Sequence, residues 1–194
     1  LVICMADSFS IERRRLMRYL GAKVILTPRA FKGMGMVSKA QELAEKSQWF
    51  LVGQFETPAN ALIHENTTGR EIMNDFAGKK LDYFVSGYGT GGTVTGVSRV
   101  LRKESPDTRV ILAEPEVAPL LSSGTEQKRV DDGTNAPAES HPSWTAHPIQ
   151  GWTPDFIPYV LQESVDNSFY DELVLVKGGD SVTMSKRLAA EEGI

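Results

Sequence analysis

The sequence predicts an α/β protein with open, mostly parallel, twisted sheets flanked by helices. Short apolar runs alternate along the chain with helical patterns of ~10–15 residues, an order that favours parallel strands with helices on the sheet faces. One apolar run, residues 81–85, leads directly into a glycine-rich turn and then into a helix. Because ligands bind beyond the carboxyl ends of parallel strands, this turn is the first candidate for a functional site.

The elements follow in order from their apolar periodicity and their boundary residues. The predicted strands are residues 1–5, 23–27, 49–52, 81–85, 109–113 and 172–177. The predicted helices are residues 10–20, 36–46, 60–76, 94–103 and 180–192, with Ser10 as the first N-cap and an interruption of the third helix at Gly69. Residues 122–147 are polar, lack periodicity and lie in a proline-rich region, so they are expected to form a long surface excursion.

Composition limits the class of protein. The 194 residues suffice for one large or two small domains, and 41% hydrophobic with 24% charged residues is typical of a globular protein. A formal net charge of -4 with dispersed basic residues argues against nucleic acid as a partner. No apolar run reaches the ~20 residues of a membrane span. The single cysteine, Cys4, excludes a disulfide framework and fits a reducing, cytoplasmic location.

The most informative segment is residues 86–93, Ser-Gly-Tyr-Gly-Thr-Gly-Gly-Thr, named the glycine loop below. Its glycines let the backbone turn sharply and bring several N–H groups close to one point. The following helix adds unpaired N–H donors and the positive end of its dipole, and Thr90, Thr93 and Thr95 add hydroxyl groups. This combination of donors predicts a phosphate-binding site.

The glycine loop alone leaves its phosphate ligand open. Gly87, Gly89 and Gly92 satisfy the G-x-G-x-x-G pattern of dinucleotide-binding folds, and Glu114 lies 27 residues beyond Gly87, about where such folds place a ribose-binding acid. Another phosphate-containing cofactor or ligand, or a tight structural turn, also fits these residues. A Walker-type P-loop is excluded because no Lys-Ser or Lys-Thr pair follows the glycines.

The other polar residues give weaker signals. The histidines, His64, His141 and His147, lack zinc-ligand spacing, so no metal site is expected. His64 is interpreted as a surface or packing residue, the other two histidines as exposed, and Cys4 as a small core residue. The polar residues at 54–60 follow a predicted strand, and they fit either turn chemistry with a helix cap at Asn60 or the orientation of a substrate carboxylate.

Several segments taken together resemble the cysteine synthase (O-acetylserine sulfhydrylase) family of fold-type II pyridoxal-phosphate enzymes, which have a tryptophan synthase β-like fold. The matches run in order along nearly the whole chain outside residues 122–147. They are Ser10-Ile11-Glu12-Arg13-Arg14, Leu20-Gly21-Ala22 with Leu26-Thr27, Gln54-Phe55 with Pro58-Ala59-Asn60 and His64, Ser86 to Gly96, and Ile149-Gln150-Gly151 with Phe156-Ile157-Pro158 and Glu191 to Ile194. Their common order makes the resemblance specific.

The resemblance implies a role for each matched segment. Gln54 would bind the substrate carboxylate, and Gly151 would lie on a loop over the face of the cofactor. Residues 1–52 would belong to a smaller N-terminal-type α/β domain, and residues 53–194 to the larger cofactor-binding domain. The phosphate of pyridoxal 5'-phosphate, which replaces the dinucleotide interpretation, would be held by Gly89, Thr90, Gly91, Gly92 and Thr93.

The reaction that the resemblance implies is a β-replacement in a homodimeric enzyme, in which O-acetylserine exchanges its acetate for sulfide and becomes cysteine. A cystathionine β-synthase type of enzyme is the near alternative, with homocysteine in place of sulfide. A truncated homologue that only binds a partner or a phosphate ligand is the non-catalytic alternative. A nicotinamide-dependent dehydrogenase is the third alternative. It differs from the others in that Glu114 would be needed for nucleotide binding.

The chain departs from the family pattern at several positions. Thr57 stands where the family usually has Asn, and residues 152–155, Trp-Thr-Pro-Asp, replace a run of small residues. Apolar residues 1–5 and the terminal Gly193-Ile194 lead us to expect that both ends cut through structural elements. The family's Schiff-base lysine and its substrate-carboxylate loop would precede Met5, so no catalytic residue is assigned, and the chain by itself is expected to be inactive.

Overall fold

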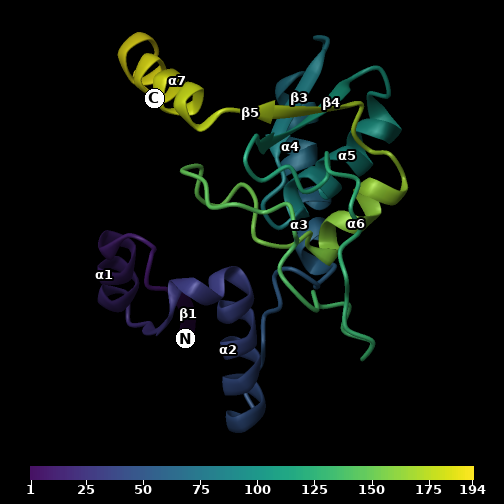
Figure 1. Cartoon of the computed structure of the whole chain (residues 1–194). Helices are drawn as coiled ribbons and strands as arrows, with labels where there is room; N and C mark the ends of the chain where they lie inside the picture. The colour runs from purple at the N-terminus through teal and green to yellow at the C-terminus, as the bar shows by residue number, and fades with distance from the viewer. The chain divides into compact units, whose positions relative to one another are not determined.

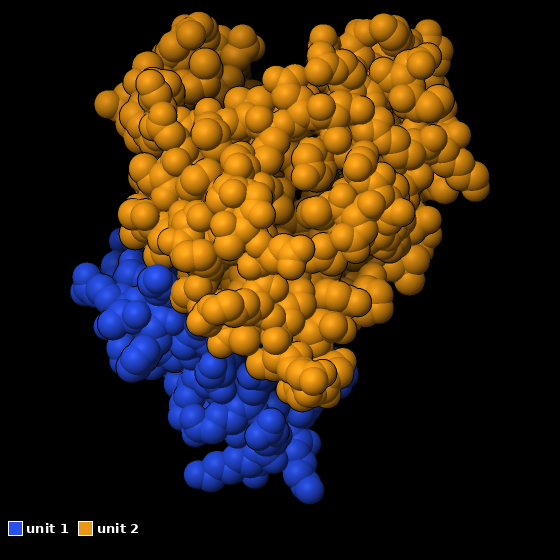
Figure 2. Space-filling model, turned by 45° about the vertical axis from the view of Figure 1, so that its right-hand side comes forward, with its two compact units in different colours: residues 1–53 blue, residues 54–194 orange.

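The chain divides into two units, Leu1–Gly53 and Gln54–Ile194, each with its own sheet and helices (Figure 1). Figure 2 shows the surface of the two units in different colours. The computed structural model describes all 194 residues. No helix of the chain combines the length and apolar character that crossing a bilayer requires. The α/β class with parallel strands that the sequence predicts is confirmed in both units.

The first unit is built from two parallel strands and the helices that connect and follow them. Its elements are β1 (Val2–Ala6), α1 (Ile11–Tyr19), β2 (Lys23–Thr27), the short 3-10 helix η1 (Arg29–Phe31) and α2 (Lys32–Ser47). Ser10 is the N-cap of α1 as predicted, and its hydroxyl accepts a hydrogen bond from the backbone N–H of Arg13 at 3.4 Å. Cys4 lies opposite Ile25 in the β1–β2 pair and is only half-buried, so it is not a full core residue.

One predicted strand is wrong. Residues 49–52, Trp-Phe-Leu-Val, form no strand and pair with no other segment, although their β-forming, apolar side chains favour a strand. Their side chains are 42–90% exposed. β-propensity reflects packing in a sheet as much as an intrinsic preference, and here no neighbouring strand offers a ladder.

The second unit contains a three-stranded parallel sheet in the order β3-β4-β5. Its strands are β3 (Tyr83–Gly87), β4 (Arg109–Pro115) and β5 (Glu172–Val176). Its helices are α3 (Ala59–Asn66), α4 (Thr68–Asp75), α5 (Gly92–Glu104), α6 (Tyr159–Asp166) and α7 (Gly178–Glu191). The predicted helix over 60–76 is divided at Thr67 rather than at Gly69, because Gly69 lies inside α4 and packs against Val100.

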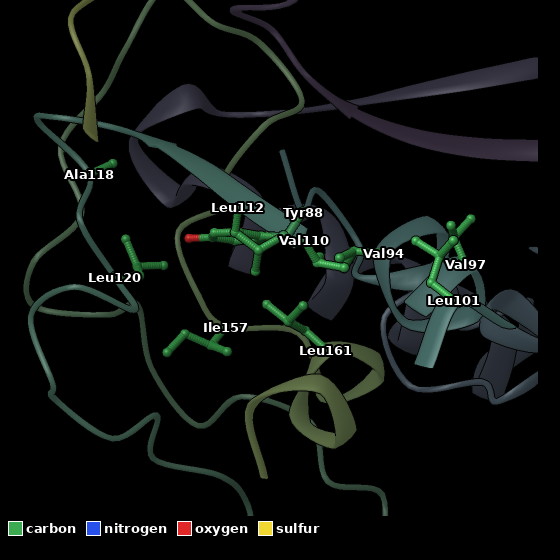
Figure 3. Packing of buried hydrophobic residues seen from close by; sticks show 10 residues of the cluster. All are labelled: Tyr88, Val94, Val97, Leu101, Val110, Leu112, Ala118, Leu120, Ile157 and Leu161. Carbon is green, nitrogen blue, oxygen red and sulfur yellow. The ribbon is translucent and has the colours of Figure 1, made fainter. Parts of the chain in front are cut away.

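The core of the second unit joins the sheet to α5 and α6. Figure 3 shows its ten buried members. Among them, Val94, Val97 and Leu101 come from α5, Val110 and Leu112 from β4, and Leu161 from α6. Helix α6 was not predicted, and its buried face supplies part of this core. Since β4 is buried along most of its length, the sheet and α5 fix the position of the turn between β3 and α5.

The predicted surface excursion at 122–147 is only partly a surface structure. An isolated antiparallel bridge joins Arg129 to Pro137, and the ring of His141 is 2% exposed, so the expectation that His141 is exposed is wrong. The His141 backbone N–H donates to the carbonyl of Asp155 at 2.7 Å, and its Nε2 lies 3.0 Å from the Thr125 carbonyl oxygen. Polar composition predicted exposure here, but these hydrogen bonds compensate for burial.

Three helices of the second unit are joined by one arginine. Arg99 of α5 donates to Glu65 of α3 at 2.9 Å and, through two nitrogens, to both carboxylate oxygens of Glu163 of α6. The Arg99 guanidinium holds the pKa of Glu163 below its usual value. A carboxylate whose folded-state pKa is depressed stabilises the protein above its unfolded-state pKa, and this stabilisation is lost as the pH falls through the folded-state pKa.

We therefore expect Glu163→Gln to lower the free energy of unfolding at pH 7 by up to about 1 kcal/mol, because the pair is partly exposed to solvent. The difference from wild type should shrink as the pH falls below ~4 and should disappear once the pH is below the depressed pKa of Glu163, where the carboxylate of the folded wild-type protein is protonated as well. Urea unfolding at pH 7 and at pH 3 measures both values. Glu126→Gln, at an exposed glutamate, is the control, and equal effects of the two variants would contradict the role of the ion pair.

Candidate phosphate site

The glycine loop connects β3 to α5, as the sequence predicts. The Gly91 N–H donates to the carbonyl of Tyr88, and Gly91 then serves as the N-cap of α5 with a left-handed φ of 91°. Gly89 also has a positive φ, 48°. L-residues with side chains rarely adopt these conformations, so the path of the loop depends on glycine at both positions.

The loop presents hydrogen-bond donors that have no partner within the protein. The backbone N–H groups of Thr90, Thr93 and Val94 make no hydrogen bond, and the Thr93 and Val94 groups belong to the open first turn of α5. The Thr90 hydroxyl accepts from Asn60, while its own proton has no acceptor. No carboxylate is hydrogen-bonded to Thr90 or Thr93. A group that only accepts hydrogen bonds, such as phosphate, fits this donor set.

Asn60 links two of the segments that the sequence singled out. Its Nδ2 donates to the backbone carbonyl of Gln54 at 2.8 Å and to the hydroxyl of Thr90 at 2.9 Å. The expectation that Asn60 caps the helix is wrong, because the N-cap of α3 is Pro58 and Asn60 lies inside the first turn. The side chain is thereby free to join the turn at Gln54 to the glycine loop.

Glycines at the end of the loop and in the helix that follows it permit close packing. A Cβ on Gly92 would lie 1.9 Å from Oδ1 of Asn60, and one on Gly91 would lie 2.7 Å from the backbone of Leu161. Gly96 faces the backbone of α3 in the same way. Gly92, together with the two donors of Asn60, therefore sets the distance between α3 and the loop.

A second segment, residues 149–153, lies directly against the glycine loop. The Gly89 N–H donates to the carbonyl of Trp152 at 2.8 Å, and the carbonyl oxygen of Gly151 lies 3.0 Å from where a Gly89 Cβ would be. The Trp152 indole covers Gly87, whose Cβ would lie 3.0 Å from the ring. The structure thus brings the predicted residues Gly89 and Gly151 together, and Trp152 makes van der Waals contact with the loop.

The hydroxyl of Thr95 and the carboxylate of Glu114 have roles different from those expected. Thr95 does not face the loop: its hydroxyl is buried and bonds to the Val160 carbonyl at 3.1 Å and to the hydroxyl of Ser164 at 2.8 Å. Glu114 is fully buried and accepts from the Tyr88 hydroxyl at 3.1 Å. The Glu114 carboxylate is therefore occupied inside the protein, which removes the ribose-binding acid of the dinucleotide interpretation.

Tyr88, inside the glycine loop, is held as a neutral hydrogen-bond donor. Its side chain is 3% exposed and belongs to the hydrophobic core. Burial, together with the charge of Glu114, raises the pKa of Tyr88 far above its usual value. The phenol therefore keeps its proton and donates it to Glu114, which ties the loop to the end of β4.

Gln54 and His64 complete the surroundings of the loop. Gln54 is exposed, and its side-chain amide makes no hydrogen bond, so it is free to bind a ligand. His64 is half-buried and lies 3.2 Å from the hydroxyl of Thr93. This contact could not be predicted from the sequence, because 29 residues separate the two partners. No cluster of three or more histidine, cysteine, aspartate or glutamate side chains is arranged to hold a metal ion.

A parallel α/β sheet with an open, donor-rich glycine loop at a strand's carboxyl end defines a phosphate-binding protein of the α/β class. The model of the family described as "Pyridoxal-phosphate dependent enzyme" matches residues 1–194. The chain therefore belongs to this pyridoxal-phosphate-dependent enzyme family. The donor set at Thr90 and Thr93 fits the phosphate of that cofactor.

Relatives of known function agree with this membership. The chain is 43% identical to O-ureido-L-serine synthase of Streptomyces lavendulae over 100% of this chain and 53% of the relative. It is 39% identical to a cysteine synthase of Staphylococcus aureus, over 100% of this chain and 55% of the relative. The chain spans about half the length of the curated relatives it matches.

Solved structures give the same result for the fold. A crystal structure of O-ureido-L-serine synthase matches with a TM-score of 0.85 and 43% identity, over 100% of this chain and 54% of that chain. An O-acetylserine-dependent cystathionine β-synthase from Helicobacter pylori matches with a TM-score of 0.81 and 30% identity, over 100% of this chain and 56% of that chain. The predicted resemblance to fold-type II pyridoxal-phosphate enzymes of the cysteine synthase type is confirmed.

Proposed function

We propose that the protein catalyses a pyridoxal-phosphate-dependent β-replacement, in which O-acetylserine and sulfide give cysteine and acetate. The observation that carries this proposal is the set of unpaired donors at Thr90 and Thr93, in the loop of a chain that belongs to this enzyme family. The cysteine synthases among its relatives support the choice of reaction. A homodimer, which the same resemblance implies, is part of the proposal.

Each residue of the site has a proposed task. The phosphate is held within residues 89–93, where Thr90 and Thr93 supply N–H and O–H donors and the glycines supply the shape. Gln54 orients the substrate carboxylate through its free amide, and Asn60 keeps Gln54 next to Thr90. Gly151 lies on the loop beside Gly89, and a Cβ there would meet nothing within 4 Å, so the space that Gly151 faces is open. The bound cofactor supplies an electron sink for charge that develops at the α-carbon of the substrate.

The group that would link the cofactor covalently to the protein is not among these residues. The side chains that contact the glycine loop include Asn60, His64 and Trp152, and none of these is a lysine. A lysine amine is the usual nucleophile toward the carbonyl of this cofactor. We therefore propose that the 194 residues alone retain the phosphate site and do not turn over substrate.

Three nucleophiles are candidates for the group that replaces acetate. The 43% identity to an O-ureido-L-serine synthase favours a second candidate, in which hydroxyurea attacks through oxygen to form O-ureido-L-serine. Homocysteine, the acceptor of the cystathionine β-synthase alternative, is a third. The bulky Trp152 beside the loop is the feature of this chain best placed to select among acceptors.

Product analysis with competing acceptors tests the function. The intact protein, loaded with pyridoxal phosphate, is given O-acetylserine with sulfide, homocysteine or hydroxyurea, and the amino acid products are separated. We expect cysteine to form with the highest kcat/KM. If O-ureido-L-serine or cystathionine formed preferentially, the proposed acceptor would be hydroxyurea or homocysteine instead of sulfide. If no product formed with any of the three acceptors, the result would contradict β-replacement.

The 194-residue chain alone serves as the matched control in this assay. We expect it to form no cysteine under conditions in which the intact protein does, because no lysine is among the side chains described at the glycine loop. Measurable turnover by the isolated chain would show that another group takes the place of a lysine amine.

A further inference from the structure

His64 connects the glycine loop to two helices. Its Nε2 lies 3.2 Å from the hydroxyl oxygen of Thr93 in α5, and its Nδ1 lies 2.9 Å from that of Thr68, the first residue of α4. His64 itself is in α3. Both ring nitrogens are therefore engaged by hydroxyl groups, and each hydroxyl can either donate or accept.

The backbone fixes where the side chain of His64 begins. Helices α3 and α5 approach so closely that a Cβ on Gly96 would lie 2.2 Å from the carbonyl of Ala61 and 2.8 Å from the Cβ of His64. The ring is then held at its two nitrogens by the hydroxyl groups of Thr68 and Thr93. The open question is the direction of these two hydrogen bonds, because it depends on which ring nitrogen carries the proton.

A phosphate ligand would decide that direction. A phosphate dianion only accepts hydrogen bonds, and Thr93 has a single hydroxyl proton. If that proton goes to phosphate, the oxygen of Thr93 must accept from His64, which places the imidazole proton on Nε2. The Nδ1 of a neutral imidazole is then an acceptor, and the hydroxyl of Thr68, which has no other partner, donates to it.

We propose that His64 is a positioning residue that directs the hydroxyl proton of Thr93 toward the cofactor phosphate, through a chain of donors that runs from Thr68 to His64 to Thr93. This inference rests on the phosphate site of the proposed function and adds the residue that orients it. With the proton on Nδ1 instead, Thr93 would donate to His64 and present only lone pairs to phosphate. His64 thus selects between a favourable and an unfavourable orientation of one hydroxyl.

Binding measurements on the intact protein test the inference without an activity assay. The probes are pyridoxal 5'-phosphate and pyridoxal, which differ in the phosphate group alone. His64→Phe keeps an aromatic ring but has no donor, so the hydroxyl of Thr93 is no longer directed toward the phosphate. We expect this variant to weaken binding of the phosphorylated probe up to about tenfold, the value of one charge-assisted hydrogen bond. Pyridoxal should bind to the variant and to wild type equally.

Two further variants separate a positioning role from a structural one. His64→Gln carries an amide donor that can reach Thr93, so we expect it to recover most of the affinity. In a Thr93→Val background, His64→Phe should have no further effect, because the hydroxyl that it orients is gone. Equal affinities of wild type and His64→Phe for the phosphorylated probe, or additive effects in the double variant, would overturn the inference.

The imidazole proton can also be located directly, which avoids substitution. In the loaded wild-type protein, nitrogen-15 NMR of His64 should show a protonated Nε2 and an unprotonated Nδ1. A neutral His64 with its proton on Nδ1 would overturn the inference while leaving the phosphate site intact. A wild-type protein that binds pyridoxal as tightly as its phosphate ester would overturn the phosphate site and, with it, the role of His64.

Discussion

Replacement of Gly96 by alanine is expected to lower the free energy of unfolding by about 3 kcal/mol, at the upper end of the usual cost of overpacking. A Cβ at this position would lie 2.2 Å from the carbonyl oxygen of Ala61 and 2.7 Å from the backbone nitrogen of Glu65. Both atoms belong to the backbone of α3, which cannot move as a side chain does. The helices must therefore separate, and this moves Asn60 and His64 away from the glycine loop.

The control for Gly96→Ala is a glycine in a helix with open space around it. Gly179 lies in the first turn of α7, and a Cβ there would meet nothing within 4 Å. We expect Gly179→Ala to be neutral or to stabilise the protein by up to ~1 kcal/mol, because alanine has the higher helix propensity. Chemical unfolding followed by circular dichroism measures both variants. Equal stabilities of Gly96→Ala and Gly179→Ala would contradict the close contact between α3 and α5 at Gly96.

The order of strand, glycine loop and helix could be predicted because it depends on neighbours in the sequence. The apolar run of β3, the glycines with positive φ and the donor-rich helix start all lie within residues 81–103. Local backbone chemistry defines them, so composition and spacing are sufficient. The resemblance to pyridoxal-phosphate enzymes followed from the same kind of local pattern, repeated in several segments.

The contacts that hold the loop could not be predicted in this way. Asn60 and Thr90 are 30 residues apart, and Thr95 and Ser164 are 69 residues apart. Which side chains meet depends on how closely the helices cross, and Gly92 and Gly96 set that distance through the side chains that they lack. A helix cap at Asn60 was therefore one of the two interpretations that the sequence left open, because capping is a common local use of asparagine.

Burial was mispredicted where polar residues find partners inside the protein. His141 and Glu114 are both types that are usually exposed or ligand-binding, yet each is at least 98% buried. Each accepts or donates several hydrogen bonds, which offsets the cost of removing it from water. The pattern of a dinucleotide site at Gly87 and Glu114 therefore arose by coincidence from a structural carboxylate.

Glu114 gives the last prediction and the sharpest contrast between the two interpretations. Its carboxylate accepts from the Tyr88 hydroxyl and the Leu121 N–H at 3.1 Å each, and from the Ser122 N–H at 2.9 Å. Removing an acceptor from buried donors costs far more than a surface change, so we expect Glu114→Ala to lower the free energy of unfolding by roughly 3–5 kcal/mol. Glu114→Gln should cost less, because its carbonyl oxygen still accepts, although its NH2 group opposes a backbone N–H, that of Leu121 or that of Ser122.

Glu116→Ala is the matched control, since this exposed glutamate lies two residues further on and its carboxylate makes no hydrogen bond. We expect it to change stability by no more than ~0.5 kcal/mol. A ribose-binding acid would behave in the opposite way: Glu114→Ala would leave stability unchanged and abolish nucleotide binding. Glu114 holds Tyr88, which is part of the glycine loop, so its structural role predicts a different result. In Glu114→Ala, phosphate affinity should fall together with stability. Glu114→Gln should lie between Glu114→Ala and wild type in both phosphate affinity and free energy of unfolding.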